Sequence, residues 1–232
     1  MPAASLREVE DQRLELRAGQ RLRLLAWNAV PFLQLAVAAL LALGPWFTWT
    51  VRLVLVVGWI FIVPALAVRL LLARRSAPTS DVPFASDAFF RWWAVSNLQA
   101  LFNRLPLLEE ALRLVPGLYS AWLRLWGARI GRTTYWAPGT SILDRPFVEI
   151  GDDVVLGVGV KCSSHLLMSR SEGDLRLLVA PIRIGDGAIV GGYSVLGPGA
   201  EIAPREATPA CQILPPFSRW ENGRRARGRS DA

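Results

Sequence analysis

The sequence has few of the side chains from which catalytic and metal sites are usually built. Its 232 residues include one histidine, His165, and two cysteines, Cys162 and Cys211. Two cysteines do not make a disulfide framework, so we expect a reducing compartment. A catalytic zinc site of the three-histidine type is excluded, because one histidine cannot supply it. We therefore predict no metal site.

The sequence also lacks lysine, since Lys161 is the only one, and arginine carries nearly all of the positive charge in a formal net charge of +7. A basic, apolar chain with 10 tryptophans favours an anionic membrane surface at least as strongly as nucleic acid. No RNA- or DNA-binding motif is present in the sequence, so we expect no nucleic-acid partner.

Charged residues are missing from a long run near the N-terminus and almost missing from a second. The first run, Leu24 to Leu43, has the length that a helix needs to cross a bilayer. The second, Leu53 to Val68, is extended by Leu70 to Leu72, and the aromatics of the intervening "GPWFTWT" suit a membrane interface. We predict a two-helix transmembrane hairpin over residues 24–75. Two buried helices of a soluble domain are the alternative, which is less favoured because neither run has a polar face.

Arginines flank the hairpin on both sides. Residues 1–23 form a basic segment, and Arg74 and Arg75 follow the second run. The positive-inside rule then places both termini in the cytoplasm, which predicts a multi-pass protein of the cell (inner) membrane with a cytoplasmic catalytic domain. A signal peptide fits poorly, because the segment before the first run is long and mixed with acids.

Residues 76–127 combine tryptophan, leucine and arginine in an amphipathic pattern. Pro106 and the Pro116–Gly117 pair divide this region into two or three short helices. Such a composition suits helices that lie in the headgroup plane. A helical collar packed on the next domain is an equal and compatible alternative.

Beyond Ala128 the dominant feature is a period of six residues. Aliphatic residues, usually followed by glycine, recur at this spacing with a short slip and one longer interruption, at Ile130, Trp136, Ile142, Ile150, Leu156, Cys162, Ile184, Val190, Leu196 and Ile202. A repeat this short must stack on copies of itself to bury a core. We therefore predict a mainly β domain, in which three strands per coil enclose a narrow triangular core.

The repeat resembles the [LIV]-G-x-x-x-x pattern of the hexapeptide-repeat acyltransferases, which implies a left-handed parallel β-helix over about residues 128–207. Within that family "APIRIGDGAIVGGYSVLGPGAEI" looks like the coil after the catalytic histidine of colanic-acid-type sugar acetyltransferases. "LYSAWLRLWGARIG" with "SSHLL" resembles the β-helix units joined to membrane segments in peptide-synthetase tails. Trp136 and Cys162 depart from the pattern, and three to four coils are expected. We predict that Trp136 closes the prism beneath the collar.

His165 follows Cys162 at a corner of the predicted coil. Counting one coil back, Ile142 underlies Cys162, so Asp144 and Arg145 should lie beneath His165. Counting one coil forward, Gly199 should lie above it. Residues 166–181 break the period directly after the histidine, which is typical of a loop that covers a site.

The resemblance implies the roles of these residues. His165 would be the general base that takes a proton from a hydroxyl or amine as that atom attacks an acyl thioester. Asp144 is the candidate for orienting the ring, with Glu149 or Asp152 as substitutes, and the Gly199 N–H is available to an oxyanion. An ordinary corner histidine is the alternative.

The resemblance also implies acetyl-CoA or another acyl-CoA as a co-substrate, with no permanently bound cofactor. Candidate contacts with the coenzyme are Gly191, Gly192, Ser194 and Gly199, with Arg183 nearby for phosphate, although the glycines serve equally well as purely architectural residues. Family members usually form homotrimers, and the membrane segments favour an amphipathic, lipid-linked or saccharide acceptor. Residues 208–232 are predicted to be a C-terminal extension with a disordered basic tail that includes Arg224, Arg225, Arg227 and Arg229.

Two other functions are alternatives for a β-helix of this kind: a zinc enzyme and a non-catalytic scaffold. A hexapeptide-repeat zinc enzyme of the carbonic-anhydrase kind is excluded by the single histidine. The remaining alternative is a non-catalytic β-helix that trimerises or scaffolds a membrane-associated biosynthetic complex.

Overall fold

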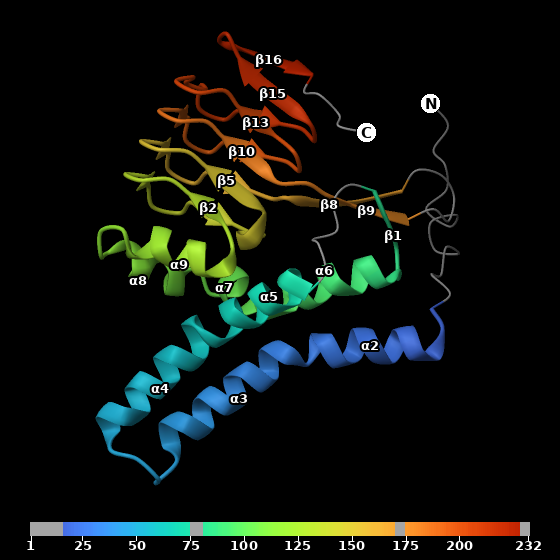
Figure 1. Ribbon diagram of the computed structural model, residues 1–232, viewed down its shortest axis with the longest axis vertical. Coiled ribbons are helices and arrows are strands. Elements are labelled where there is room, and N and C mark those ends of the chain that lie inside the picture. Colours follow the sequence, from blue (N-terminus) through green and yellow to red (C-terminus); the bar gives the residue numbers. More distant parts are fainter. Residues whose placement is uncertain (1–15, 75–80, 170–174, 228–232) are drawn as a thin grey trace.

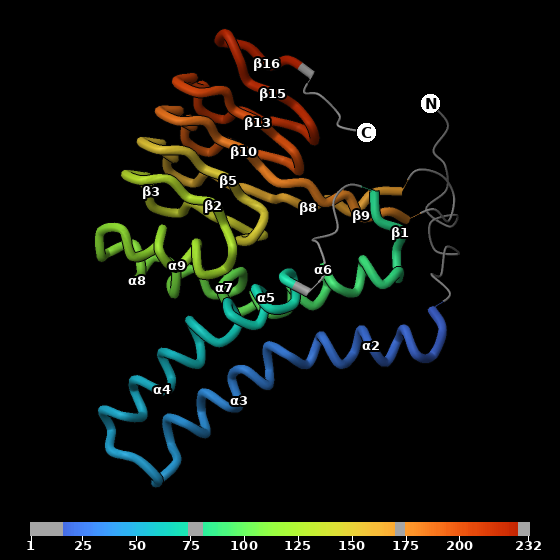
Figure 2. The backbone as a smooth tube through the Cα atoms, in the orientation of Figure 1, coloured from blue at the N-terminus to red at the C-terminus, as the bar shows by residue number. Residues whose placement is uncertain are grey.

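The computed structural model describes residues 16–74, 81–169 and 175–227, and it stacks a helical hairpin, a layer of short helices and a β-helix (Figure 1). One arm of the hairpin contains α2 (Ala18–Asn28) and α3 (Val30–Leu43), and the other contains α4 (Trp49–Phe61) and α5 (Val63–Arg74). Each arm changes direction between its two helices (Figure 2), where Pro31 and Pro64 begin the second helix of the arm. Proline there removes a backbone donor, which accounts for the breaks.

Both arms of the hairpin are long and apolar enough to cross a membrane. They span Ala18–Leu43 and Trp49–Ala73, and the structure buries only 6% and 17% of their most apolar windows. This low burial distinguishes both helices from the core helix of a soluble protein, which is mostly buried. The transmembrane hairpin stays a prediction. Its first helix begins at Ala18, so Arg21 and Arg23 of the predicted basic segment lie on α2.

Between the hairpin and the β-helix lies a collar of four short helices (Figure 1). They are α6 (Asp87–Leu98), α7 (Ala100–Arg104), α8 (Leu107–Arg113) and α9 (Leu118–Trp126), preceded by β1 (Val82–Pro83). Ser86 caps α6 by accepting the Phe89 N–H at 3.2 Å, and Pro106 and Gly117 stand at the starts of α8 and α9 as their residue types predict. The aromatic side chains of α6 and α9 are largely buried, which supports the collar alternative.

The predicted period builds a three-sided parallel β-helix. Its strands are β2 (Arg129–Ile130), β3 (Tyr135–Trp136), β4 (Ser141–Ile142), β5 (Val148–Ile150), β6 (Val155–Leu156), β7 (Lys161–Cys162), β10 (Ile182–Ile184), β11 (Ile189–Val190), β12 (Val195–Leu196), β13 (Glu201–Ile202), β14 (Ile213–Leu214), β15 (Ser218–Glu221) and, antiparallel to β15, β16 (Arg224–Arg227). Parallel pairing runs β2–β5–β10–β13–β15 on one side, β3–β6–β11 on the second and β4–β7–β12–β14 on the third. All of the predicted inward positions except Trp136 are at most 7% exposed.

Trp136 packs where the collar meets the first coil, as predicted. Its indole N–H donates to the Ser120 hydroxyl at 2.9 Å, and its ring makes an edge contact with Tyr119 of the neighbouring helices. The half-buried indole therefore joins α9 to the base of the prism and keeps water from the narrow core.

The β-helix extends further than its predicted end at residue 207. Thr208, Leu214 and Trp220 keep the six-residue spacing and are all buried, and β14 and β15 pair in parallel with β12 and β13. Threonine and tryptophan replace aliphatic residues at two of these positions, so the aliphatic pattern in the sequence ends before the β-helix does. The β15–β16 hairpin also replaces most of the tail that was predicted to be disordered, while Arg229 lies outside the described residues.

Candidate functional site

An arm of two strands leaves the β-helix at His165. β8 (His165–Ser169) and β9 (Leu175–Val179) pair antiparallel, and β1 adds a third strand to β9. In Figure 1 this arm projects from the stack above α6. The interruption over residues 166–181 was predicted to be a loop, and the described part of it is mainly this hairpin. The arm begins at the only histidine and gives it a wall on one side.

Asp144 lies against His165, as the coil count predicted. Ile142 pairs with Cys162 in the parallel register, and Asp144 Oδ2 stands 2.6 Å from His165 Nδ1. The same oxygen accepts the Ser164 N–H at 2.9 Å. Asp144 is 1% exposed, whereas the histidine side chain is 28% exposed. The substitutes lie elsewhere, since Glu149 pairs with Arg183 and Asp152 pairs with Arg132.

This pairing fixes which ring nitrogen is available for chemistry. Because a carboxylate only accepts hydrogen bonds, the ring tautomer that fits this pair carries its hydrogen on Nδ1 and has its lone pair on Nε2. The Trp92 ring lies 4.8 Å from the imidazole, and the Ser163 hydroxyl donates to the His165 carbonyl at 2.9 Å. Asp144 and Trp92 therefore contact the imidazole ring, and Ser163 holds the backbone carbonyl of His165.

A buried ionic cluster supports the turn that carries Asp144. The Arg145 N–H donates to Gln99 Oε1 at 2.8 Å, and Arg145 Nε donates to Glu109 Oε1 at 2.9 Å. Tyr119 donates its hydroxyl to Glu109 at 2.7 Å, and Arg113 donates to the same carboxylate at 3.2 Å. Burial, followed by the Glu109 charge, raises the pKa of Tyr119 well above its usual value, so the phenol stays a neutral donor. The position of Arg145 near the histidine was predicted from the sequence, whereas its partners Gln99 and Glu109 were not.

His165 opens into an apolar cavity of about 560 Å³. The cavity lies where three parts of the chain meet: α2, α6 with the turn between β1 and α6, and β8 with the corner before it. Its lining residues are Leu24, Asn28, Phe84, Phe89, Trp92, Trp93, Ser163, His165, Leu166 and Leu167. This volume falls in the range of small-molecule sites. The structure therefore brings together the imidazole, the buried carboxyl group paired with it and an adjoining cavity.

The predicted contacts for the coenzyme are not brought together on this chain. Gly191, Gly192 and Ser194 lie at the corner between β11 and β12, whereas His165 follows β7. Ser194 is buried, and its hydroxyl accepts the Gln212 N–H and donates to Pro209 O. A Cβ on Gly191 would come within 2.2 Å of Pro209 O, so this glycine is required by the close stacking of coils.

The Gly199 N–H is not free for an oxyanion. Gly199 lies one coil above His165 as predicted, but its N–H donates to Ala180 O at 3.1 Å, where the arm rejoins the stack. Its φ of +67° and a Cβ position 2.6 Å from the Phe217 ring both call for glycine there. An oxyanion would therefore have to displace the Ala180 carbonyl from this N–H, and the predicted role of the Gly199 amide stays a prediction.

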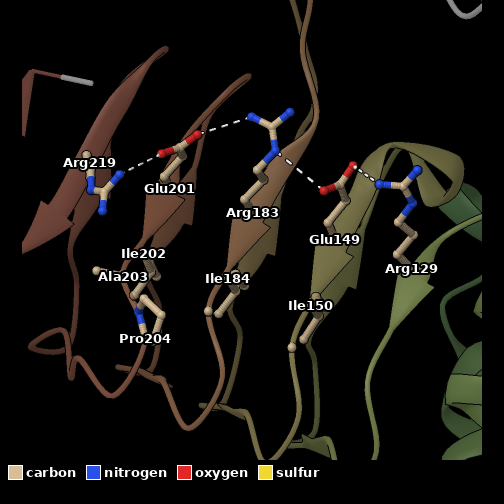
Figure 3. Close-up of a pocket in the computed structure, with 12 residues that line it drawn as sticks. Arg129, Glu149, Ile150, Arg183, Ile184, Glu201, Ile202, Ala203, Pro204 and Arg219 are labelled. Atoms are coloured by element: carbon tan, nitrogen blue, oxygen red, sulfur yellow. Dashed lines mark hydrogen bonds and ion pairs between the residues drawn. The ribbon is translucent and has the colours of Figure 1, made fainter. Parts of the chain in front are cut away.

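Arg183 belongs to a row of alternating charges on one side of the β-helix (Figure 3). Its guanidinium lies 3.4 Å from Glu149 and 3.1 Å from Glu201, and Arg129 and Arg219 pair with the outer sides of those carboxylates. A phosphate group would have to compete with two carboxylates for this side chain. The row therefore links neighbouring coils electrostatically.

Cys162 has the inward position that the sequence predicted. Its thiol is buried in the prism, and burial raises its pKa to about 12. Such a thiol is not a nucleophile at neutral pH. Within the described residues, no group of three or more His, Cys, Asp or Glu side chains is placed to hold a metal ion.

No protein-family model matches the chain, and no curated protein matches it. Among solved structures, it is similar to a hexapeptide-repeat-containing acetyltransferase from Vibrio cholerae, at 19% identity over 57% of this chain and 93% of the other, with a TM-score of 0.38. The same protein complexed with acetyl coenzyme A is 20% identical over 60% of this chain and 92% of the other, again with a TM-score of 0.38. A galactoside acetyltransferase in complex with coenzyme A is 16% identical over 55% of this chain and 82% of the other, with a TM-score of 0.34. Because these scores are below 0.5, the assignment of a function rests on the residues of the site.

Proposed function

We propose that this protein is a membrane-associated acyltransferase of the left-handed β-helix type. It uses acetyl-CoA or another acyl-CoA and transfers the acyl group to a hydroxyl or amine of an amphipathic or saccharide acceptor. The observation that carries the proposal is the pair formed by buried Asp144 and the lone histidine, whose Nε2 is left for chemistry beside a cavity. A scaffold has no use for this arrangement.

The reaction uses His165 as a general base and then as a general acid. The acceptor O–H or N–H gives its proton to Nε2 while its lone pair forms a bond to the thioester carbonyl carbon. Collapse of the tetrahedral intermediate breaks the C–S bond, and the departing thiolate takes the proton from the imidazolium to give free coenzyme A. The Asp144 carboxylate at 2.6 Å stabilises the imidazolium between these steps.

The membrane part of the proposal places the hairpin in the cell membrane and the β-helix on its cytoplasmic side. The low burial of both arms supports it, as does their attachment to the collar through the Trp122 indole on Phe61 O at 2.9 Å. A homotrimer is also proposed. Exposed apolar side chains on the outer faces and corners of the β-helix, at Tyr135, Ile189, Tyr193 and Ile213, support association with further copies.

A donor screen tests the reaction. The purified full-length chain, in lipid nanodiscs, is given acyl-CoA thioesters of increasing chain length together with alcohol and amine acceptors, and thiol release is followed. We expect release that depends on both donor and acceptor. A folded protein that releases no thiol from any donor would favour the scaffold function instead.

Replacing Asp144 with asparagine should lower acyl transfer by less than the about 10²- to 10⁴-fold that loss of the base itself would cost, because the imidazole remains but loses the carboxylate that orients it. The amide keeps the shape but can present N–H to Nδ1, which favours the wrong tautomer. We expect the change in kcat, with KM for the donor nearly constant. Glu149→Gln is the matched control, since that carboxylate lies in the outer charge row and should leave the rate unchanged.

A further inference from the structure

The cavity at His165 offers few hydrogen bonds to a polar ligand. Its walls consist mainly of two tryptophans, two phenylalanines and three leucines. Among the polar groups of the lining, Asn28 Oδ1 accepts the Trp93 indole N–H at 3.0 Å and the Ser163 hydroxyl donates to the His165 carbonyl, while the Trp92 indole N–H is buried without a hydrogen-bond partner. A free sugar would lose its hydrogen bonds to water without replacement, which costs free energy for each buried hydroxyl. An alkyl chain has no such cost.

One wall of the cavity is part of a candidate membrane span. Leu24 and Asn28 lie on α2, which belongs to the apolar stretch Ala18–Leu43. Polar contacts join α2 to the start of α6 and to the turn before it, since Arg23 pairs with Asp87 at 2.9 Å and Gln20 donates to Ala85 O at 3.1 Å. On the other side of α2, Leu22 and Leu25 are exposed. The cavity is thus separated from the apolar outer surface of the hairpin by a single helix.

We infer that this cavity binds the alkyl chain of a membrane-lipid acceptor. The chain enters between α2 and α6, and the hydroxyl or amine of the lipid reaches His165 Nε2. The inference rests on the proposed function and goes beyond it by naming the class of acceptor and its binding site. A water-soluble donor can then reach the same corner from the β-helix side while the acceptor stays in the lipid.

The test uses the full-length chain in phosphatidylcholine nanodiscs, with acetyl-CoA as the donor and primary alkanols of four, eight and twelve carbons as acceptors. Each methylene that becomes buried should raise kcat/KM by about fourfold. Leu24→Trp and Leu167→Trp fill the cavity from opposite walls and should remove this gain. Leu22→Trp is the matched control on the outward side of α2 and should keep it.

A binding readout accompanies the rates. A long-chain alkanol that carries a diazirine in its chain should label residues of β8 and α6 in the wild type and in Leu22→Trp, and label them weakly in the two filled variants. Mapping by mass spectrometry shows the site without any turnover.

Three outcomes separate the inference from the proposed function. Turnover that depends on His165 but not on alkanol length overturns the inference and leaves the acyltransferase standing. A length gain that appears only when the acyl chain of the donor is extended assigns the cavity to the donor and also overturns it. Specific labelling without turnover of any alkanol supports an apolar binding site but overturns the inference that its occupant is the acceptor, and the acyltransferase assignment is then decided by the donor screen with the other acceptors.

Discussion

His165→Ala should lower kcat for acyl transfer by about 10²- to 10⁴-fold, the contribution that a positioned general base usually makes. The variant removes the only imidazole of the chain and leaves Asp144, the cavity and the β-helix in place. Removing the ring takes one hydrogen-bond partner from the buried Asp144 carboxylate, which keeps the Ser164 N–H, so we expect a loss of stability of about 1–3 kcal/mol and compare the rates where both proteins are folded. The measurement is thiol release from the best donor of the screen, beside circular dichroism and a thermal unfolding midpoint.

Two further measurements make this prediction specific. Free imidazole added to His165→Ala should restore part of the rate, since the vacated space adjoins an open cavity. The double variant His165→Ala/Asp144→Asn should be no slower than His165→Ala alone, because residues that act as a unit give non-additive losses. A single variant that stays within a few fold of the wild-type rate would support the scaffold function.

The core of the fold and the central pair of the site were predictable, because both follow from one periodic pattern. Inward residues at a fixed spacing give the register between coils, and the register that pairs Ile142 with Cys162 also brings Asp144 under His165. The six-residue period did not predict the last turns of the β-helix, because the spacing continues there but the residue types change. Thr208 and Trp220 occupy inward positions in the last turns, but neither belongs to the pattern of aliphatic residues followed by glycine.

The rest of the site depends on contacts that no local pattern encodes. Gln99 and Glu109 reach Arg145 from 46 and 36 residues away, and α2 forms a wall of the cavity from the far end of the chain. Their positions follow from how the collar packs, which is decided by large aromatic side chains without a repeat. For Gly199 the position one coil above His165 was predicted correctly. Its hydrogen bond to Ala180 O could not be predicted from the period, because Ala180 lies in the interruption of the repeat.

Glu109→Leu should destabilise the protein by about 3–5 kcal/mol, because it leaves the buried Arg145 guanidinium without its carboxylate. Arg113 and the Tyr119 hydroxyl lose the same partner, so the loss should be at the upper end of this range. The comparison variant is Glu149→Ala, which breaks exposed pairs on the outside of the β-helix and should cost less than about 1 kcal/mol. Unfolding of the full-length chain, followed by tryptophan fluorescence in denaturant, measures both.

The double variant Glu109→Leu/Arg145→Met tests the physical cause of that loss. Replacing both partners of a buried ion pair with apolar side chains of similar size is often neutral, because no unpaired charge is left behind. We therefore expect the double variant to recover most of the stability that Glu109→Leu loses. Its acyl transfer should remain reduced, since the turn that holds Asp144 loses the charged anchor to the collar. If Glu109→Leu were no less stable than Glu149→Ala, the cluster would have no structural role and the rigidity of the Asp144–His165 pair would need another source.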